Sequence, residues 1–275
     1  MLNRWLYTHL PTVRQLLTRM SYEYVSILDK DERVLLLNYG YADLNSGSRP
    51  IQLNPEDERH RYEVQLYHHL ATTIPINWEG LDVLEVSSGR GGGACYLKNR
   101  FHPQSVTGVD FSRKAVSFCN QYYDTAGLSF VHGDAETLDF PAQSFDVIVN
   151  IEASFYYPHI KRFFNNVVRI LKPDGYFHYA DMRYAGEMKA WRKQLQAMGL
   201  QLLFEEDITA NVVKAMALDR ERREKLIQGY VPKILHRPFN HLWGITGAGL
   251  VNGDAEFGER LYMSFVLRKN GSPSW

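Results

Sequence analysis

The chain has 275 residues, enough for one large domain or for a domain with a small appended part. Its 31 lysine and arginine residues equal its 31 aspartate and glutamate residues in number. A net charge of zero excludes a general electrostatic attraction to nucleic acid or to an anionic membrane, so we expect no nucleic-acid partner.

The two cysteines, Cys95 and Cys119, lack the spacing of a metal site, and so few cysteines are typical of a reducing compartment. We expect no bound metal. Residues 1–17 are amphipathic and lack the apolar core and cleavage site of a signal peptide. No uncharged apolar stretch approaches the roughly 20 residues that span a bilayer. These features predict a cytoplasmic protein without stable membrane insertion.

The first 75 residues are predicted to form a helical cap. Residues 54–58 (NPEDE) combine a capping residue, a proline at the first helical position and acids that favour the positive end of a helix dipole. Tyr62, Leu66 and Leu70 continue at helical spacing. We therefore expect a helix that starts at Asn54.

From residue 81 onward, short apolar strands alternate with helices. The predicted strands are residues 81–86, 105–110, 128–134, 145–153 and 176–182. The predicted helices start in the glycine-rich segment after residue 91, at Ser112 and at residue 159, and the last one ends before KPDG. Such alternation predicts an α/β fold, a Rossmann-like doubly wound parallel sheet covered on both faces.

The C-terminal part has a different pattern. Residues 209–229 form a charged helix with an apolar edge, and the last predicted strand is residues 261–269. We expect this strand to be antiparallel and to complete a sheet of seven strands with a helical lid over the carboxyl ends, where open parallel sheets bind ligands. The expected parts are an N-terminal cap or lid (1–75), a cofactor-binding core (76–204), a lid insertion (205–255) and a C-terminal edge strand of the core (256–275).

A glycine-rich turn and two strand-end acids form the most specific pattern in the sequence. The segment from Glu85 to Gly93 (EVSSGRGGG) follows the first strand, and its glycines allow a tight turn and close approach to a ligand. Asp110 ends the second strand, where an acid can accept hydrogen bonds from ribose hydroxyls. Asp134 ends the third strand and is placed to receive the amine of an adenine. Together they indicate an adenosine-containing ligand.

The residues of the turn distinguish between the possible adenosine-containing ligands. The turn does not read G-x-G-x-x-G, and it lacks the Gly-Lys-Ser/Thr of a P-loop, which disfavours a dinucleotide or ATP. A carboxylate at Glu85 would repel a pyrophosphate, but it attracts the sulfonium and amino groups of S-adenosylmethionine. We therefore expect S-adenosylmethionine as the cofactor.

At this point the sequence resembles a family. VLEVSSGRGGGACYL (83–97) is similar to the cofactor loop of the O-methyltransferases that act on mycobacterial phenolic glycolipids, phthiotriol lipids and glycopeptidolipids, and the resemblance extends from NYGY (38–41) to GERLYMSFVLRK (258–269). It implies an S-adenosylmethionine-dependent methyltransferase (EC 2.1.1.-) that acts on a small or lipid-like natural product. The candidate cofactor-binding residues are Tyr39, Glu85, Ser87, Gly89, Asp110, Phe111, Asp134, Ala135, Glu136 and Asn150.

The chain departs from this family at two places. Residues 87–89 read Ser-Ser-Gly where the relatives carry Gly-Cys-Gly, and serine still fits a tight turn. Phe155 stands where the relatives carry the histidine that deprotonates the acceptor hydroxyl, although Asp181, the aspartate that supports this histidine, is retained. Because phenylalanine cannot accept a proton, either another residue serves as the base or the acceptor needs little deprotonation.

Two histidines are candidates for the missing base. His159 starts a helix and His241 lies in the expected lid, and each could equally be a surface histidine. His178, within a strand, is predicted to be buried packing. The candidate catalytic residues are His159, Asp181 and His241, and the candidate substrate-binding residues are Phe155, Tyr156 and Tyr157.

The first expectation for the reaction is methylation of a hydroxyl. Since a neutral amine can attack first and lose its proton afterwards, N-methylation, or C-methylation of an acidic carbon, is an alternative. A protein of the same fold that binds the cofactor without methylating is another. We expect a small-molecule substrate and a monomer or homodimer.

Overall fold

A computed structural model describes residues 34–44, 51–55, 57–230, 232–233 and 260–271. The first 33 residues of the expected cap and residues 234–255 of the expected lid insertion, which include the candidate base His241, lie outside the described residues. What is described contains the whole of the predicted cofactor-binding core.

The described part of the chain builds a seven-stranded sheet with the order β3-β2-β1-β4-β5-β7-β6. The strands are β1 (Asp82–Val86), β2 (Ser105–Asp110), β3 (Leu128–His132), β4 (Phe145–Ile151), β5 (Leu171–Tyr184), β6 (Gln201–Asp207) and β7 (Arg260–Arg268). The pairs among β1 to β5 are parallel, and β7 is antiparallel to both of its neighbours, β5 and β6. The predicted α/β fold, a doubly wound sheet of seven strands with an antiparallel last strand, is confirmed.

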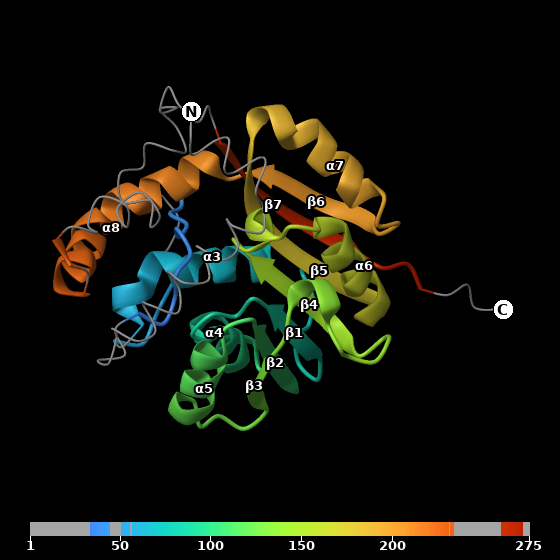
Figure 1. The fold of residues 1–275 in the computed structure, drawn as a ribbon, viewed down its shortest axis with the longest axis horizontal. Coiled ribbons are helices and arrows are strands. Elements are labelled where there is room, and N and C mark those ends of the chain that lie inside the picture. Colours follow the sequence, from blue (N-terminus) through green and yellow to red (C-terminus); the bar gives the residue numbers. More distant parts are fainter. Residues whose placement is uncertain (1–33, 45–50, 56, 231, 234–259, 272–275) are drawn as a thin grey trace.

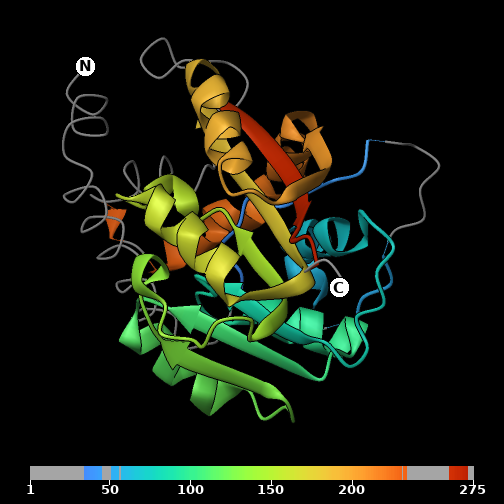
Figure 2. The same cartoon turned by 90° about the vertical axis from the view of Figure 1, so that its right-hand side faces the viewer.

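Helices cover both faces of this sheet (Figure 1). The helices are α3 (Arg61–Thr72), α4 (Gly92–Phe101), α5 (Arg113–Tyr122), α6 (Ile160–Ile170), α7 (Met188–Gln196) and α8 (Thr209–Tyr230). Figure 2 views the sheet from the side of α6 and α7, with α3, α4, α5 and α8 behind it. None of the described helices combines the length and the apolar character needed to cross a bilayer.

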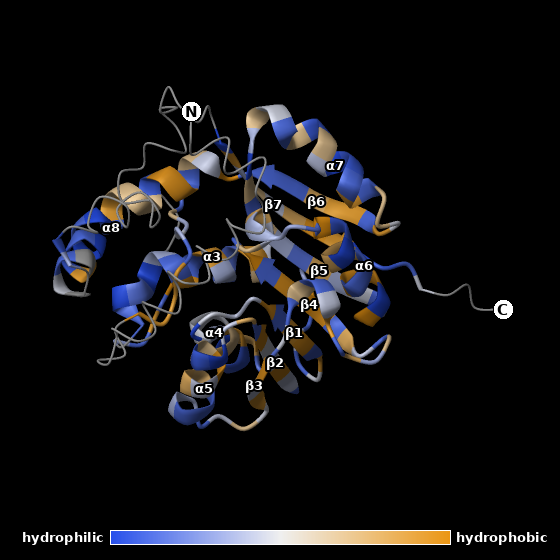
Figure 3. Ribbon diagram, in the orientation of Figure 1, coloured by the Kyte–Doolittle hydropathy of each residue, from blue (hydrophilic) through white to orange (hydrophobic). Residues whose placement is uncertain are grey.

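Alternate residues of the central strands enter two separate cores. Val83 of β1 and Val147 of β4 pack on the side of α3 and α4, whereas Leu84 and Ile148 pack against α6 and α7. Because both faces are buried, these strands consist of nearly continuous apolar residues, which Figure 3 shows on the sheet. The pattern explains why the sequence identifies the central strands well.

The sequence prediction of the first described helix is wrong at its start. The helix expected from Asn54 begins at Arg61 instead, after a short 3-10 helix, η1 (Glu58–His60). The N–H of Asp57 donates to the carbonyl of Asn54 at 3.0 Å, so the chain makes a turn where the capping pattern predicts a helix.

The sequence pattern also fails to locate β6. Leu202 and Leu203 are adjacent and both exposed, so this edge strand lacks the alternation of a half-buried strand. It extends to Asp207, across the boundary expected between residues 204 and 205. The division of the chain into cap, core and lid stays a prediction.

Residues 34–42, here called the covering segment, pass over the carboxyl ends of the strands. The carbonyl of Leu35 accepts the N–H of Gly92 at the start of α4, at 3.2 Å. Farther along, Tyr41 N–H donates to Tyr62 O of α3 at 2.9 Å. The segment thereby closes one side of the crevice between β1 and β4, where the strand order reverses and ligands bind in such sheets.

Candidate active site

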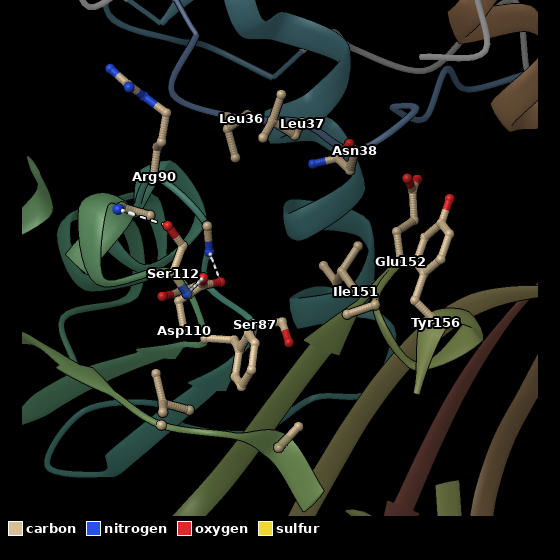
Figure 4. Close-up of a pocket in the computed structure, with 18 of the residues that line it drawn as sticks. Leu36, Leu37, Asn38, Ser87, Arg90, Asp110, Ser112, Ile151, Glu152 and Tyr156 are labelled. Carbon is tan, nitrogen blue, oxygen red and sulfur yellow. Dashed lines mark hydrogen bonds between the residues drawn. The ribbon is translucent and has the colours of Figure 1, made fainter. Parts of the chain in front are cut away.

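A cavity of about 1240 Å³, open mouth included, lies at the carboxyl ends of β1, β2 and β4. Its walls come from the turn after β1, the ends of β2 and β4, and Leu35 to Asn38 of the covering segment (Figure 4). This value includes the solvent space at the mouth. The cavity lies where open parallel sheets bind their ligands.

The turn after β1 is built from left-handed backbone. Ser87, Gly89 and Gly91 have φ angles of 62°, 55° and 79°. A Cβ at Gly91 would lie 2.6 Å from the Phe130 ring, so only glycine fits there. Ser87 bears the cost of this conformation but its Oγ lies 2.6 Å from the Tyr157 hydroxyl, which anchors it. The turn therefore keeps its shape although Ser87 replaces the family's glycine.

Asp110 fixes the position of this turn. Its carboxylate accepts the N–H of Gly89 at 2.8 Å through one oxygen and the N–H of Ser112 at 2.8 Å through the other. Figure 4 shows these contacts at the cavity wall. Burial raises the pKa of Asp110, and the hydrogen bonds from the backbone oppose the rise. Asp110 lines the cavity, and its role as a ribose-binding acid stays a prediction.

Glu85 lies just behind the wall. The hydroxyl of Tyr67, which lines the cavity, donates to Glu85 Oε1 at 2.5 Å, and Glu85 Oε2 has no hydrogen-bond partner among the described residues. Burial raises the pKa of Glu85 to about 8. A Cβ at Gly93 would lie 2.1 Å from the Tyr67 ring, so the glycine admits this ring. A buried carboxyl oxygen without a partner suits a ligand with a cationic N–H donor.

Some of the remaining candidate cofactor residues line the cavity, and the others lie behind the lining and support it. Phe111, Asp134 and Ala135 line the cavity, and Asp134 also accepts the N–H of Glu136 at 2.8 Å. Glu136 is outside the lining. Asn150 is fully buried behind it, where its Nδ2 donates to Val86 O at 2.9 Å.

Tyr39 belongs to the covering segment and is a support residue. It is buried outside the lining, and its N–H donates to Glu152 Oε1 at 2.7 Å. Its neighbour Asn38 lines the cavity.

The β4 side of the cavity is formed by the residues that follow β4. Tyr156 and Tyr157 line the cavity, whereas Phe155 is buried behind it and packs edge-on against Tyr156, with 5.4 Å between ring centroids. Glu152 also lines this side. Sequence reasoning did not single out Glu152, although its place directly after a strand of the nucleotide-binding half was a signal that could have found it.

Asp181 acts on the backbone beside Phe155. Its carboxylate accepts the Ser154 hydroxyl at 2.5 Å and the Phe155 N–H at 2.9 Å, and it pairs with Arg183 at 3.3 Å. It is fully buried and outside the lining. Since position 155 carries no histidine side chain, Asp181 instead binds the main chain of the loop after β4.

The structure separates the three histidines considered from the sequence. His159 is exposed and outside the cavity lining, and its N–H donates to Glu136 Oε1 at 2.6 Å. His178 is fully buried, its Nδ1 lies 2.8 Å from Leu70 O, and burial lowers its pKa to about 4, in agreement with a packing role. His241 lies outside the described residues. No group of three or more potential metal ligands occurs among the described residues.

The sheet order, the antiparallel β7, the glycine-rich turn and the carboxylates at the ends of β1 and β2 define a class I S-adenosylmethionine-dependent methyltransferase. These hydrogen-bond acceptors fit this cofactor, since Asp110 offers a carboxylate at the wall and Glu85 an oxygen without a partner among the described residues.

Comparison with known proteins identifies the family. Residues 84–179 match the methyltransferase domain family. The chain is 36% identical over 240 residues to a phthiotriol/phenolphthiotriol dimycocerosates methyltransferase of Mycobacterium tuberculosis, covering 87% of each chain. It is 38% identical over 223 residues to a fatty-acid O-methyltransferase of Mycolicibacterium smegmatis, covering 81% of this chain and 80% of that one. The chain belongs to this family of S-adenosylmethionine-dependent methyltransferases.

Solved structures share the fold at low sequence identity. The [4+2]-cyclase SpnF superimposes with a TM-score of 0.70 at 18% identity, over 93% of this chain and 96% of that one. A putative sarcosine dimethylglycine methyltransferase from Galdieria sulphuraria gives a TM-score of 0.68 at 15% identity, over 86% and 93%. Since a cyclase and a methyltransferase share this architecture, the fold alone does not define the acceptor chemistry.

Proposed function

We propose that the protein transfers the methyl group of S-adenosylmethionine to an oxygen of a lipid-like small molecule. The observation that carries this proposal is the likeness, at 36% and 38% identity, to enzymes named for phthiotriol dimycocerosates and for fatty acids. A long apolar acceptor fits a cavity that is lined in part by Tyr156 and by Leu35 to Leu37 of the covering segment.

In this proposal the β1–β2 side holds the cofactor. Asp110 accepts hydrogen bonds from the ribose, Asp134 receives the adenine amine, and Glu85 faces the cationic methionine part. The other contacts come from the walls and supports already described, namely Tyr39, Ser87, Gly89, Phe111, Ala135, Glu136 and Asn150. When bound, S-adenosylmethionine supplies a methyl group activated by its sulfonium. The protein contributes position, since in-line displacement depends mainly on alignment.

The acceptor side is proposed to be Tyr156 and Tyr157, with Phe155 behind them and Asp181 as the residue that positions their backbone. The proposed role of His159 as a base has no support from its exposed position outside the cavity lining. We therefore expect the base among the residues that line the cavity.

Phe155 favours a second candidate acceptor. A fatty acid is already ionised at neutral pH, so its carboxylate can attack without a base. The family's histidine would then be dispensable, and the product would be an ester. A neutral amine is the remaining alternative for the same reason.

The decisive experiment incubates the purified protein with methyl-labelled S-adenosylmethionine and three matched acceptors: a long-chain secondary alcohol, a long-chain fatty acid and a long-chain amine. Label in the ether supports the proposed reaction, and label in the ester supports the second candidate. Label in the amine alone, or in none of the three although calorimetry shows that the cofactor binds, contradicts transfer to oxygen.

We further propose that the protein works on free small molecules in the cytoplasm as a monomer or homodimer. Light scattering of the purified protein, with and without cofactor, gives the oligomeric state. A larger assembly would contradict this part of the proposal.

A further inference from the structure

The backbone directs Glu152 toward the cavity. Glu152 is the first residue after β4, and its φ of 51° is in the left-handed region that disfavours side chains with a Cβ. Its N–H is held by the carbonyl of Ala180 at 2.8 Å. Figure 4 shows its carboxyl group beside the Tyr156 ring, with the two polar ends turned the same way. The residue thus occupies the acceptor side at a conformational cost.

The two carboxyl oxygens of Glu152 have different surroundings. Oε1 accepts the Tyr39 N–H at 2.7 Å and the Tyr262 hydroxyl at 2.7 Å. No hydrogen bond from the described residues reaches Oε2. The fixed oxygen orients the group, and the other is available to a ligand in the cavity.

The neighbouring position 155 is poorly suited to a base that becomes cationic. The guanidinium carbons of Arg183 and Arg260 lie 5.6 Å and 5.4 Å from the centre of the Phe155 ring. An imidazolium placed there would be repelled by both charges. A carboxylate, which becomes neutral when it takes a proton, does not meet this difficulty.

The pKa of Glu152 also suits a group that accepts a proton. Burial raises its pKa to about 8, against the hydrogen bonds from Tyr39 and Tyr262. A base is most effective when its pKa is close to the working pH. The other titratable or charged groups that face it are Arg223 of α8, Asp181 of β5 and Tyr67 of α3.

We propose that Glu152 is the proton acceptor for a hydroxyl acceptor, in place of the histidine that the chain lacks at position 155. This inference rests on the proposed transfer to oxygen. The acceptor oxygen forms its bond to the methyl carbon while its proton moves to Glu152 Oε2. The bond between methyl and sulfur breaks with its electron pair kept by sulfur, and the products are a methyl ether and S-adenosylhomocysteine. Glu152 then returns the proton to solvent through the open mouth.

The test compares Glu152→Gln with Glu79→Gln, an exposed control. With the long-chain alcohol, Glu152→Gln should lower kcat by about 10²–10⁴-fold. Its affinity for S-adenosylmethionine should stay within about twofold of wild type, because the amide still accepts from Tyr39 and Tyr262. Any transfer to the fatty acid, which has no proton to lose, should fall far less.

A second variant tests proton transfer to Glu152 through the pH dependence of the reaction. Tyr262→Phe removes a donor that favours the ionised carboxylate, so the acid limb of kcat/KM with the alcohol should move to higher pH. Tyr176→Phe, a partly buried tyrosine of β5, is the control and should leave the profile unchanged.

The outcomes separate the two proposals. Full alcohol activity in Glu152→Gln, or an unmoved pH profile in Tyr262→Phe, overturns the role of Glu152 while transfer to oxygen stands. A wild-type enzyme that binds the cofactor but methylates neither the alcohol nor the fatty acid overturns both. If Glu152→Gln does not fold, the pH profile of Tyr262→Phe decides.

Discussion

Two carboxyl groups on the β1–β2 side of the cavity, Asp110 and Glu85, can be compared with two on the β4–β5 side, Asp181 and Glu152. On each side one group has both oxygens bonded, Asp110 by backbone N–H groups and Asp181 by Ser154, the backbone and Arg183. The other group, Glu85 or Glu152, has one oxygen without a partner among the described residues. The comparison teaches that Asp110 and Asp181 hold the chain through both carboxyl oxygens, although Asp110 also lines the cavity, whereas Glu85 and Glu152 each keep one oxygen for a ligand.

The largest expected effect concerns the saturated carboxylate on the acceptor side. Asp181→Ala leaves the buried Arg183 without its ionic partner and the Phe155 N–H without an acceptor. The free energy of unfolding should fall by about 3–5 kcal/mol. Urea unfolding measures it, with Glu152→Gln as the comparison that should lose much less. Equal losses in the two variants would remove the distinction between them.

On the cofactor side, Asp110→Ala should weaken binding of S-adenosylmethionine by about 1–3 kcal/mol. The variant removes the proposed ribose acceptor and also frees the Gly89 N–H of the turn. Calorimetry should show wild-type affinity for Asp139→Ala, an exposed control from the same region. Unchanged affinity in a folded Asp110 variant would exclude this residue from the site.

The half-bonded Glu85 predicts a pH dependence of cofactor binding. Its pKa of about 8 means that Glu85 is mostly protonated at pH 7, and a cationic ligand favours the ionised form. Binding at pH 7 should therefore release a proton, and affinity should rise by up to about tenfold per pH unit below 8 and level off above it. Calorimetry in buffers of different ionisation enthalpy measures the release. A flat profile, equal to that of Glu85→Gln, would show that Glu85 does not sense the ligand.

The smallest expected effect is at the departure from the family's turn. Ser87→Gly relieves a left-handed serine but removes its bond to the Tyr157 hydroxyl. Because the backbone gain and the lost hydrogen bond are of similar size, the free energy of unfolding should change by less than about 1 kcal/mol. A larger loss in urea unfolding would make this hydroxyl pair a principal support of the site.

The sequence predicted well the parts whose causes are local. Continuous apolar runs identify strands buried on both faces, and the turn from Glu85 to Gly93 requires glycine at specific backbone angles. The edge strand β6 was not predicted because its pairing with β7, rather than a pattern in its own sequence, holds it in the sheet. The prediction of a helix start at Asn54 was wrong because the same capping residues form a turn there.

The acceptor side could not be predicted in the same way. Glu152 depends on Tyr39 and Tyr262, which lie 113 and 110 residues away along the chain. Nothing in the order of residues brings these three together. The pairing of β4 with β5 and of β5 with β7 places Tyr262 near Glu152, and the covering segment brings Tyr39. The loss of the histidine at position 155 was visible in the sequence, whereas the carboxylate beside it required the fold.

Tyr157 has a consequence for how the two substrates meet. Its hydroxyl lies 2.6 Å from Ser87 Oγ on the cofactor turn and accepts from Asn150 Nδ2 of β4 at 3.0 Å, while the residue itself lines the cavity. An acceptor that moves this hydroxyl therefore also acts on the turn that holds the cofactor. Thermodynamic linkage then requires that each ligand changes the affinity of the other by the same factor, so the two binding events are coupled through one shared phenol.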